Sequence, residues 1–343
     1  MGHNLLIILA MVFTASFVYA NEASEDDQAL PAMVAVDEPL SDKEPLSEKE
    51  PLSEEDDYAD ILAKFPGLAE KIEAEKYATK NPYLLLPHKP NYFMPLTYQS
   101  QINQEEQEEF YDGIIEENTD AEGEQEGFEN TEFVFQLSVK YIIAEDIVGK
   151  NSSLAVAYTG KSYWQAYNSD ISALFRETNH EPEIILGFAP GFSWSDHMSV
   201  SFTHQSNGQI GNLSRSWNRI IFSTAKVWPD RILNVRAWYR IPEEEKETPN
   251  STEGDDNPDI QEYMGYGDVF YLRKFGEHSI GITMRNNLRP GENLGAVELD
   301  WTFPLPGGMK GFVQYFNGYG ESLIDYDQYQ ERIGVGIKIS DWL

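Results

Sequence analysis

The chain of 343 residues has no cysteine, so it can form neither a disulfide bond nor a thiolate metal site. Its six histidines are scattered, without the spacing typical of a zinc site. Beyond residue 20 the sequence has no apolar run of about 18 residues, which excludes further membrane-spanning helices. Basic residues are also scarce, since 25 lysines and arginines stand against 58 aspartates and glutamates. We expect no nucleic-acid partner, because phosphate binding needs a basic surface.

The N-terminus carries one apolar run, from Leu5 to Val18, and it is followed by Tyr19 and Ala20. This pattern predicts a secretory signal peptide over residues 1–20, although the usual basic residues before the run are missing. A single membrane anchor is the alternative, and the run is short for a spanning helix.

The segment after the signal peptide is strongly acidic. Residues 21–130 hold 30 acidic and 7 basic residues, and a six-residue Glu-Pro-Leu-Ser repeat starts at Glu38, Glu44 and Glu50. Such a tract has too little apolar surface to offset the entropy lost on ordering. We therefore predict that residues 21–84 are a disordered periplasmic extension.

From about Asn91 onward, apolar and polar residues alternate, which predicts strands with one apolar and one polar face. The clearest stretch is near the C-terminus, where Ile333, Val335 and Ile337 alternate with Gly334 and Gly336. The first predicted strand spans 91–98 and the last 331–341, with twelve in all. The fourth is placed at 183–190, after a polar connection over 165–182, and the eighth at 260–273.

Alternation alone fits either a soluble sandwich or a membrane barrel, and two further features favour the barrel. Aromatic residues such as Trp228, Trp301 and Trp342 gather near strand ends, as in an interfacial girdle. Predicted connections are alternately long and short, as in bacterial outer-membrane barrels. We therefore predict an all-β fold for residues 85–343, a twelve-stranded antiparallel transmembrane β-barrel with both termini on the periplasmic side.

Three polar residues carry the candidate chemistry. His204 and Ser206 share the apolar face of the fifth strand by period two, and Asn218 shares that of the sixth. A hairpin brings such residues to within about 5 Å of each other. Ser206 would then be a nucleophile, His204 its base and Asn218 the residue that orients the imidazole. The alternative is that they are ordinary polar residues of the girdle.

Four segments, within residues 85–343, resemble the outer membrane phospholipase A family. They are Tyr158-Thr159-Gly160-Lys161-Ser162-Tyr163-Trp164-Gln165, the stretch from His204 to Arg219, Asp255-Asp256-Asn257-Pro258-Asp259, and Gly318-Tyr319-Gly320-Glu321-Ser322. The resemblance implies a twelve-stranded barrel that hydrolyses both acyl chains of phospholipids, with calcium and with activation on dimerisation. By position, Ser206, His204 and Asn218 match the catalytic residues of the family, and Gly208 matches the oxyanion donor.

The resemblance also implies a calcium ion shared across a homodimer. Its ligands match the Ser172 hydroxyl of one chain and the Gln209 and Ser214 carbonyls of the other. Asp256 matches an acid of a second calcium site in some members, where Gly211 stands in place of its partner acid. Gly160 replaces a glutamine associated with the dimer contact.

We therefore expect a calcium-dependent phospholipase A1/A2 with lysophospholipase activity, acting at the external leaflet of the outer membrane on membrane phospholipids. The alternative is an inactive barrel that serves as a channel or scaffold. Bulky inward residues such as Arg236 and Trp238 argue against passive diffusion through twelve strands.

Overall fold

A computed structural model describes residues 84–102, 127–169, 172–248 and 254–340, and the single residues 77, 81 and 251. The predicted signal peptide over 1–20 and nearly all of the predicted extension over 21–84 lie outside the described residues. In the described ranges, no helix is long and apolar enough to cross a bilayer.

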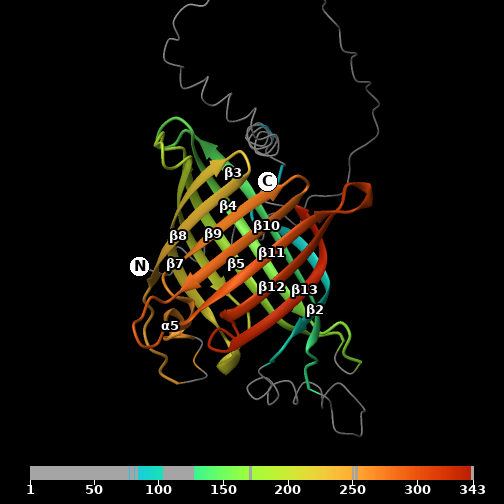
Figure 1. The fold of residues 1–343 in the computed structure, drawn as a ribbon. Coiled ribbons are helices and arrows are strands. Elements are labelled where there is room, and N and C mark those ends of the chain that lie inside the picture. Colours follow the sequence, from blue (N-terminus) through green and yellow to red (C-terminus); the bar gives the residue numbers. More distant parts are fainter. Residues whose placement is uncertain are drawn as a thin grey trace, which may run out of the picture. The chain divides into compact units, whose positions relative to one another are not determined.

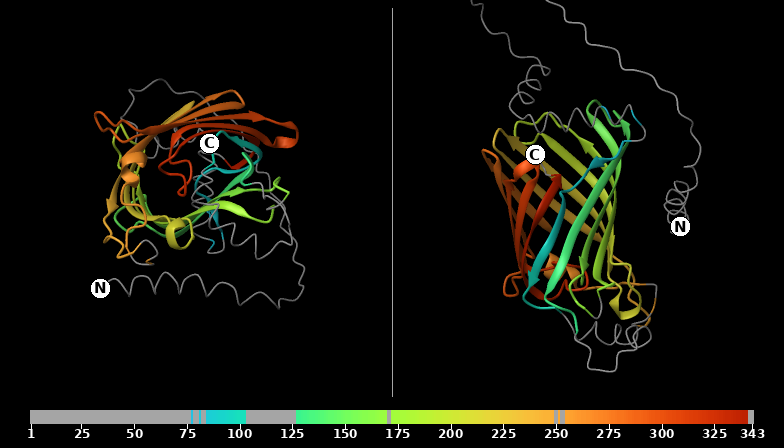
Figure 2. Two further views of the ribbon diagram at one scale, coloured as in Figure 1. Left: turned by 90° about the horizontal axis from the view of Figure 1, so that it is seen from below. Right: turned by 90° about the vertical axis from the view of Figure 1, so that its right-hand side faces the viewer.

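Antiparallel strands make up almost all of the described structure (Figure 1). In chain order they are β1 (Leu86–Pro87), β2 (Asn91–Gln99), β3 (Thr131–Glu145), β4 (Ser152–Trp164), β5 (Phe175–Phe188), β6 (His197–Ser206), β7 (Ser216–Trp228), β8 (Arg231–Ile241), β9 (Gly267–Phe275), β10 (His278–Asn286), β11 (Gly295–Pro304), β12 (Lys310–Tyr319) and β13 (Tyr329–Ser340). Each strand from β2 to β13 pairs with the next, and β13 pairs with β2, so the twelve strands close a barrel (Figure 2). The predicted fold is confirmed.

Alternation along the strands separates an apolar outer wall from a polar interior. In β13, Ile333, Val335 and Ile339 are exposed, whereas Arg332 is buried. The same outward exposure is seen for Leu137, Val139, Ile143, Ile184, Phe202, Phe222, Val235, Tyr239, Ile280, Met284, Val297, Leu299 and Trp301. An apolar surface that continues around a closed barrel is suited to lipid, not to water.

The connections define two different ends of the barrel. At one end, β7 to β8 and β9 to β10 are joined by two residues each, 229–230 and 276–277. At the other end lie the longer loops 165–174, 207–215, 242–266, 287–294 and 320–328. We call these the turn end and the loop end. Because Asn91 pairs with Ser340 at the turn end, the barrel sequence begins and finishes there.

Two local expectations were altered by the structure. The predicted strand 260–273 begins with a helix, α5 (Ile260–Met264), and β9 starts only at Gly267. β5 begins at Phe175, so much of the predicted connection 165–182 is strand. Pro95 stays inside β2 but falls at a register shift between Met94 and Thr97, where its missing N–H is tolerated.

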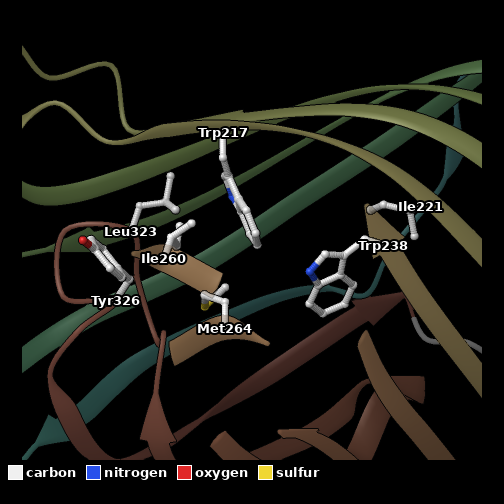
Figure 3. Packing of buried hydrophobic residues seen from close by; sticks show 7 residues of the cluster. All are labelled: Trp217, Ile221, Trp238, Ile260, Met264, Leu323 and Tyr326. Atoms are coloured by element: carbon white, nitrogen blue, oxygen red, sulfur yellow. The ribbon is translucent and has the colours of Figure 1, made fainter. Parts of the chain in front are cut away.

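Ion pairs and apolar contacts fill the interior. Arg176 is fully buried, and its guanidinium contacts Glu132 at 2.7 Å and Asp325 at 2.5 Å. Towards the loop end an apolar cluster joins the wall, α5 and the loop 320–328 (Figure 3). Its members are Trp217, Ile221, Trp238, Ile260, Met264, Leu323 and Tyr326. This packing supports the inner side of the wall where β7 meets β8.

Candidate active site

The candidate site lies on the β6–β7 hairpin, next to the loop end. His204 and Asn218 are register partners, as are Ser206 and Ser216. Phe202 and Phe222, on the same face of these strands, are exposed on the outer wall. Period two therefore places His204, Ser206 and Asn218 on the outer wall as well, as the sequence predicted.

The His204 imidazole is held by an amide across the hairpin. Its Nδ1 lies 2.9 Å from Asn218 Oδ1, which is an ordinary hydrogen-bond length. Because the amide oxygen can only accept, this contact places the proton of a neutral imidazole on Nδ1. Nε2 is then the nitrogen with a free lone pair, as a general base requires.

A tight loop follows Ser206. The side chain of Asn207 closes it, since Nδ2 donates to the Leu213 carbonyl at 2.9 Å and Oδ1 accepts from the Arg215 N–H at 2.9 Å. Gly208 has a φ of 68°, which lies in the left-handed region that favours glycine. The sequence Ser-Asn-Gly therefore forms a fixed turn directly after the serine.

Behind the site, inward side chains of the same strands pack together. Trp217 Nε1 donates to Gln205 Oε1 at 2.8 Å, and the Arg219 guanidinium lies 4.0 Å from the Trp217 ring centre. Arg219 also contacts Glu181 at 3.3 Å. These buried contacts fix the backbone of both strands, so the outward side chains are carried on a rigid wall.

Two contacts at the site were not predicted from the sequence. Asn218 Nδ2 donates to Glu243 Oε1 at 2.8 Å, and burial raises the pKa of the Glu243 carboxyl above its usual range. On the other side of Ser206, the Tyr158 hydroxyl lies 2.6 Å from His180 Nδ1. His180 is the register partner of Ser206. Glu243 belongs to the run Glu243-Glu244-Glu245, in which nothing singles out one carboxylate.

Ser172, Gln209 and Ser214, which the family resemblance assigns to calcium, all lie in loops of the loop end. Gln209 and Ser214 flank η1 (Gly211–Leu213) in the loop after Ser206, and Ser172 is exposed in the loop before β5. Hydroxyl and carbonyl oxygens are hard ligands that suit calcium. The described residues contain no cluster of three or more histidines, aspartates or glutamates that could hold a metal ion.

The carboxylate of Asp256 is already engaged by an ion pair and by hydrogen bonds within the protein. Its Oδ1 lies 2.5 Å from Lys246 Nζ, and its Oδ2 accepts from the hydroxyls of Ser214 and Ser216 at 2.9 Å each. Gly211 has a φ of 63° and offers no side-chain oxygen. These residues do not fit a second calcium site, because an ammonium group already neutralises the carboxylate.

Comparisons with known proteins point to one family. A family model described as Phospholipase A1 matches residues 68–339. The Phospholipase A1 of Klebsiella pneumoniae is 36% identical over 265 residues, which cover 76% of this chain and 84% of the relative. The Phospholipase A1 of Escherichia coli strain K12 is 34% identical, over 76% of this chain and 83% of the relative.

Two solved structures share the barrel. Outer membrane phospholipase A from Escherichia coli superposes with a TM-score of 0.65 at 32% identity, over 77% of this chain and 94% of that one. The calcium-bound dimer of the Salmonella typhi outer membrane phospholipase gives a TM-score of 0.64 at 34% identity, over 76% and 94%. The resemblance drawn from the sequence is confirmed: the chain belongs to the phospholipase A1 family of outer-membrane ester hydrolases.

Proposed function

We propose that this enzyme hydrolyses the acyl esters of phospholipids at its lipid-facing wall, with Ser206 as nucleophile, His204 as base and Asn218 as the residue that orients the base. The observation that carries the proposal is the 2.9 Å contact between His204 Nδ1 and Asn218 Oδ1 on an otherwise apolar outer surface. A polar pair at such a place costs desolvation unless its groups are hydrogen-bonded, as they are here.

The reaction follows from these groups. Ser206 Oγ attacks the acyl carbonyl carbon while its proton passes to His204 Nε2, and the carbonyl oxygen becomes an oxyanion. The Gly208 N–H stabilises that oxyanion, a charge that develops only on the way to the transition state. When the carbon–oxygen bond to the glycerol breaks, the imidazolium returns its proton to the leaving oxygen.

An acyl-serine and a lysophospholipid result from this first half. Water then attacks the acyl carbon with His204 again as the base, which releases a fatty acid and restores Ser206. Because the lysophospholipid keeps one acyl ester, the same site can cleave it in a second round. This accounts for phospholipase A1, A2 and lysophospholipase activity from one set of residues.

The apolar wall around the site suits the rest of the substrate. Phe202 and Phe222 lie along the strands below His204 and Asn218, and both are exposed. Acyl chains in the bilayer would therefore lie against the wall, with the ester near the loop end. We assign the loop end to the outside of the cell, which places the site at the external leaflet, because longer loops are external in bacterial barrels.

Calcium and a second copy of the chain complete the proposal. The Ser172 hydroxyl of one chain, with the Gln209 and Ser214 carbonyls of the other, would hold the ion near Gly208. When bound, the ion supplies positive charge beside the developing oxyanion. The support is the oxygen chemistry of these residues and their place beside the catalytic loop. A related solved structure is described as a dimer with bound calcium.

The test is hydrolysis of a phospholipid in mixed detergent micelles with calcium. We expect release of fatty acid by the wild type, and loss of that release in Ser206→Ala. Ser199→Ala, in an inward position of the same strand, is the matched control and should keep full activity. Equal background rates for the wild type and Ser206→Ala would favour the alternative of an inactive channel or scaffold.

A further inference from the structure

Glu243 lies beside the catalytic hairpin although it is distant from it in the sequence. β8 ends at Ile241, which is the register partner of Asn218 on β7. Glu243 follows two residues later, so it continues the outward side of the strand. Its side chain is half-buried and reaches Asn218.

The Glu243 carboxylate binds the amide NH₂ of Asn218, the part of the amide that does not contact His204. Nδ2 donates to Glu243 Oε1 at 2.8 Å, and Oδ1 faces His204 Nδ1 at 2.9 Å. An amide by itself could turn over and present its NH₂ to the imidazole. A carboxylate accepts only, so it keeps the NH₂ on its own side and the oxygen towards His204.

The loop that carries Glu243 is attached to the barrel by other contacts. Arg240 pairs with Asp255 at 2.5 Å, Lys246 pairs with Asp256 at 2.5 Å, and the Ser216 N–H donates to Asn257 Oδ1 at 2.9 Å. These three contacts already attach the loop to the barrel, so Glu243 is not needed as an anchor. Even partial burial of a carboxylate costs desolvation, and the hydrogen bond from Asn218 offsets that cost.

We propose that Glu243 is a positioning residue of the catalytic site, which fixes the Asn218 amide and places a negative charge behind the imidazolium of the transition state. The proposal rests on the proposed function. It extends the hydrogen-bonded pair of His204 and Asn218 to Glu243, with the carboxylate at the end away from His204. The neutral amide alone lacks the charge that an aspartate provides in a Ser-His-Asp site.

The first test is Glu243→Gln beside Glu245→Gln, an exposed glutamate of the same run. We expect Glu243→Gln to lower kcat roughly 10- to 100-fold with KM unchanged, because a neutral amide, which can also present its own NH₂, replaces the charged acceptor of the Asn218 amide. Its thermal unfolding temperature should not fall, and Glu243→Asp should recover part of kcat. Glu245→Gln should match the wild type. An unchanged kcat in Glu243→Gln, or a fall explained by unfolding, would overturn the proposal.

A double substitution tests the positioning role of Glu243 more directly. Asn218→Asp alone sets two carboxylates against each other, and we expect it to lower kcat strongly. In Asn218→Asp/Glu243→Gln the aspartate needs no orienting partner, and the repulsion is gone, so kcat should rise at least several-fold above that of Asn218→Asp. If the double variant is no more active than Asn218→Asp, the positioning role is wrong. Full activity in Ser206→Ala would instead refute the proposed function itself.

Discussion

The Tyr158 hydroxyl on β4 lies 2.6 Å from Nδ1 of His180 on β5. The other edge of this imidazole faces the turn after Ser206, since a β-carbon added to Gly208 would lie 3.7 Å from His180 Nε2. A second histidine therefore borders Ser206, the proposed nucleophile, on the β5 side, while Asn218 lies on the β7 side.

Removing the Tyr158 hydroxyl should reduce the rate modestly. In Tyr158→Phe the His180 ring loses its partner, and the turn at Gly208 that lies beside this ring becomes less well held. Loss of one ordinary hydrogen bond corresponds to about 1 kcal/mol, so we expect kcat to fall roughly three- to tenfold. Tyr239→Phe, an exposed tyrosine of the outer wall, is the control in the same micelle assay. Equal rates for Tyr158→Phe and Tyr239→Phe would show that the contact between Tyr158 and His180 has no role in the site.

The ammonium group of Lys246 should neutralise Asp256 in the place that a metal ion could otherwise take. Lys246→Met leaves the carboxylate with only the hydroxyls of Ser214 and Ser216, so we expect the thermal unfolding temperature to fall. Calcium should then raise that temperature more in the variant than in the wild type, because Asp256 becomes available to a metal ion. Lys274→Met, at an exposed position of the turn end, should do neither. A calcium response equal to that of the wild type would contradict this account.

Most of the barrel was predictable because a lipid-facing wall imposes strict alternation. Residues such as Ile333 and Val335 have to be apolar, and their neighbours face a polar interior. The prediction failed where both faces are polar. The start of β5 was missed because Arg176 and Glu177 are buried in ion pairs and hydrogen bonds that only the closed barrel creates. Ile260–Met264 is apolar at both ends, and its five residues are too short to distinguish a helix turn from a strand.

The candidate site, like the barrel, could be predicted only in part. His204, Ser206 and Asn218 could be proposed as a site because they lie on one hairpin, whose register the sequence makes predictable. Glu243 was missed because its meaning depends on the path of the chain after β8, and its acidic neighbours look the same in sequence. The sequence was therefore least informative about the tertiary contacts that loops make.

The interior ion pairs should dominate the stability of the barrel. Arg176 is fully buried between Glu132 and Asp325, so Arg176→Met leaves two carboxylates without their cation. We expect a loss of about 3–5 kcal/mol in the free energy of unfolding. Arg231→Met removes an exposed arginine 3.6 Å from Asp230 and should cost less than about 1 kcal/mol. Denaturant unfolding followed by tryptophan fluorescence compares them, and equal losses would show that the interior pairs carry no special weight.

Ser172 offers the most selective test of the calcium proposal. Its backbone carbonyl accepts a hydrogen bond from Trp164 Nε1 at 2.8 Å, so Ser172→Ala keeps that contact and loses only the hydroxyl. Chelation of calcium should abolish hydrolysis by the wild type, and added calcium should restore it. Ser172→Ala should need a higher calcium concentration for half-maximal activity and for crosslinking into dimers, because one oxygen ligand of the shared ion is gone. Ser199→Ala should respond as the wild type does. If chelation leaves both hydrolysis and crosslinking unchanged, calcium has no part in this enzyme, and the Gly208 N–H must stabilise the oxyanion without it.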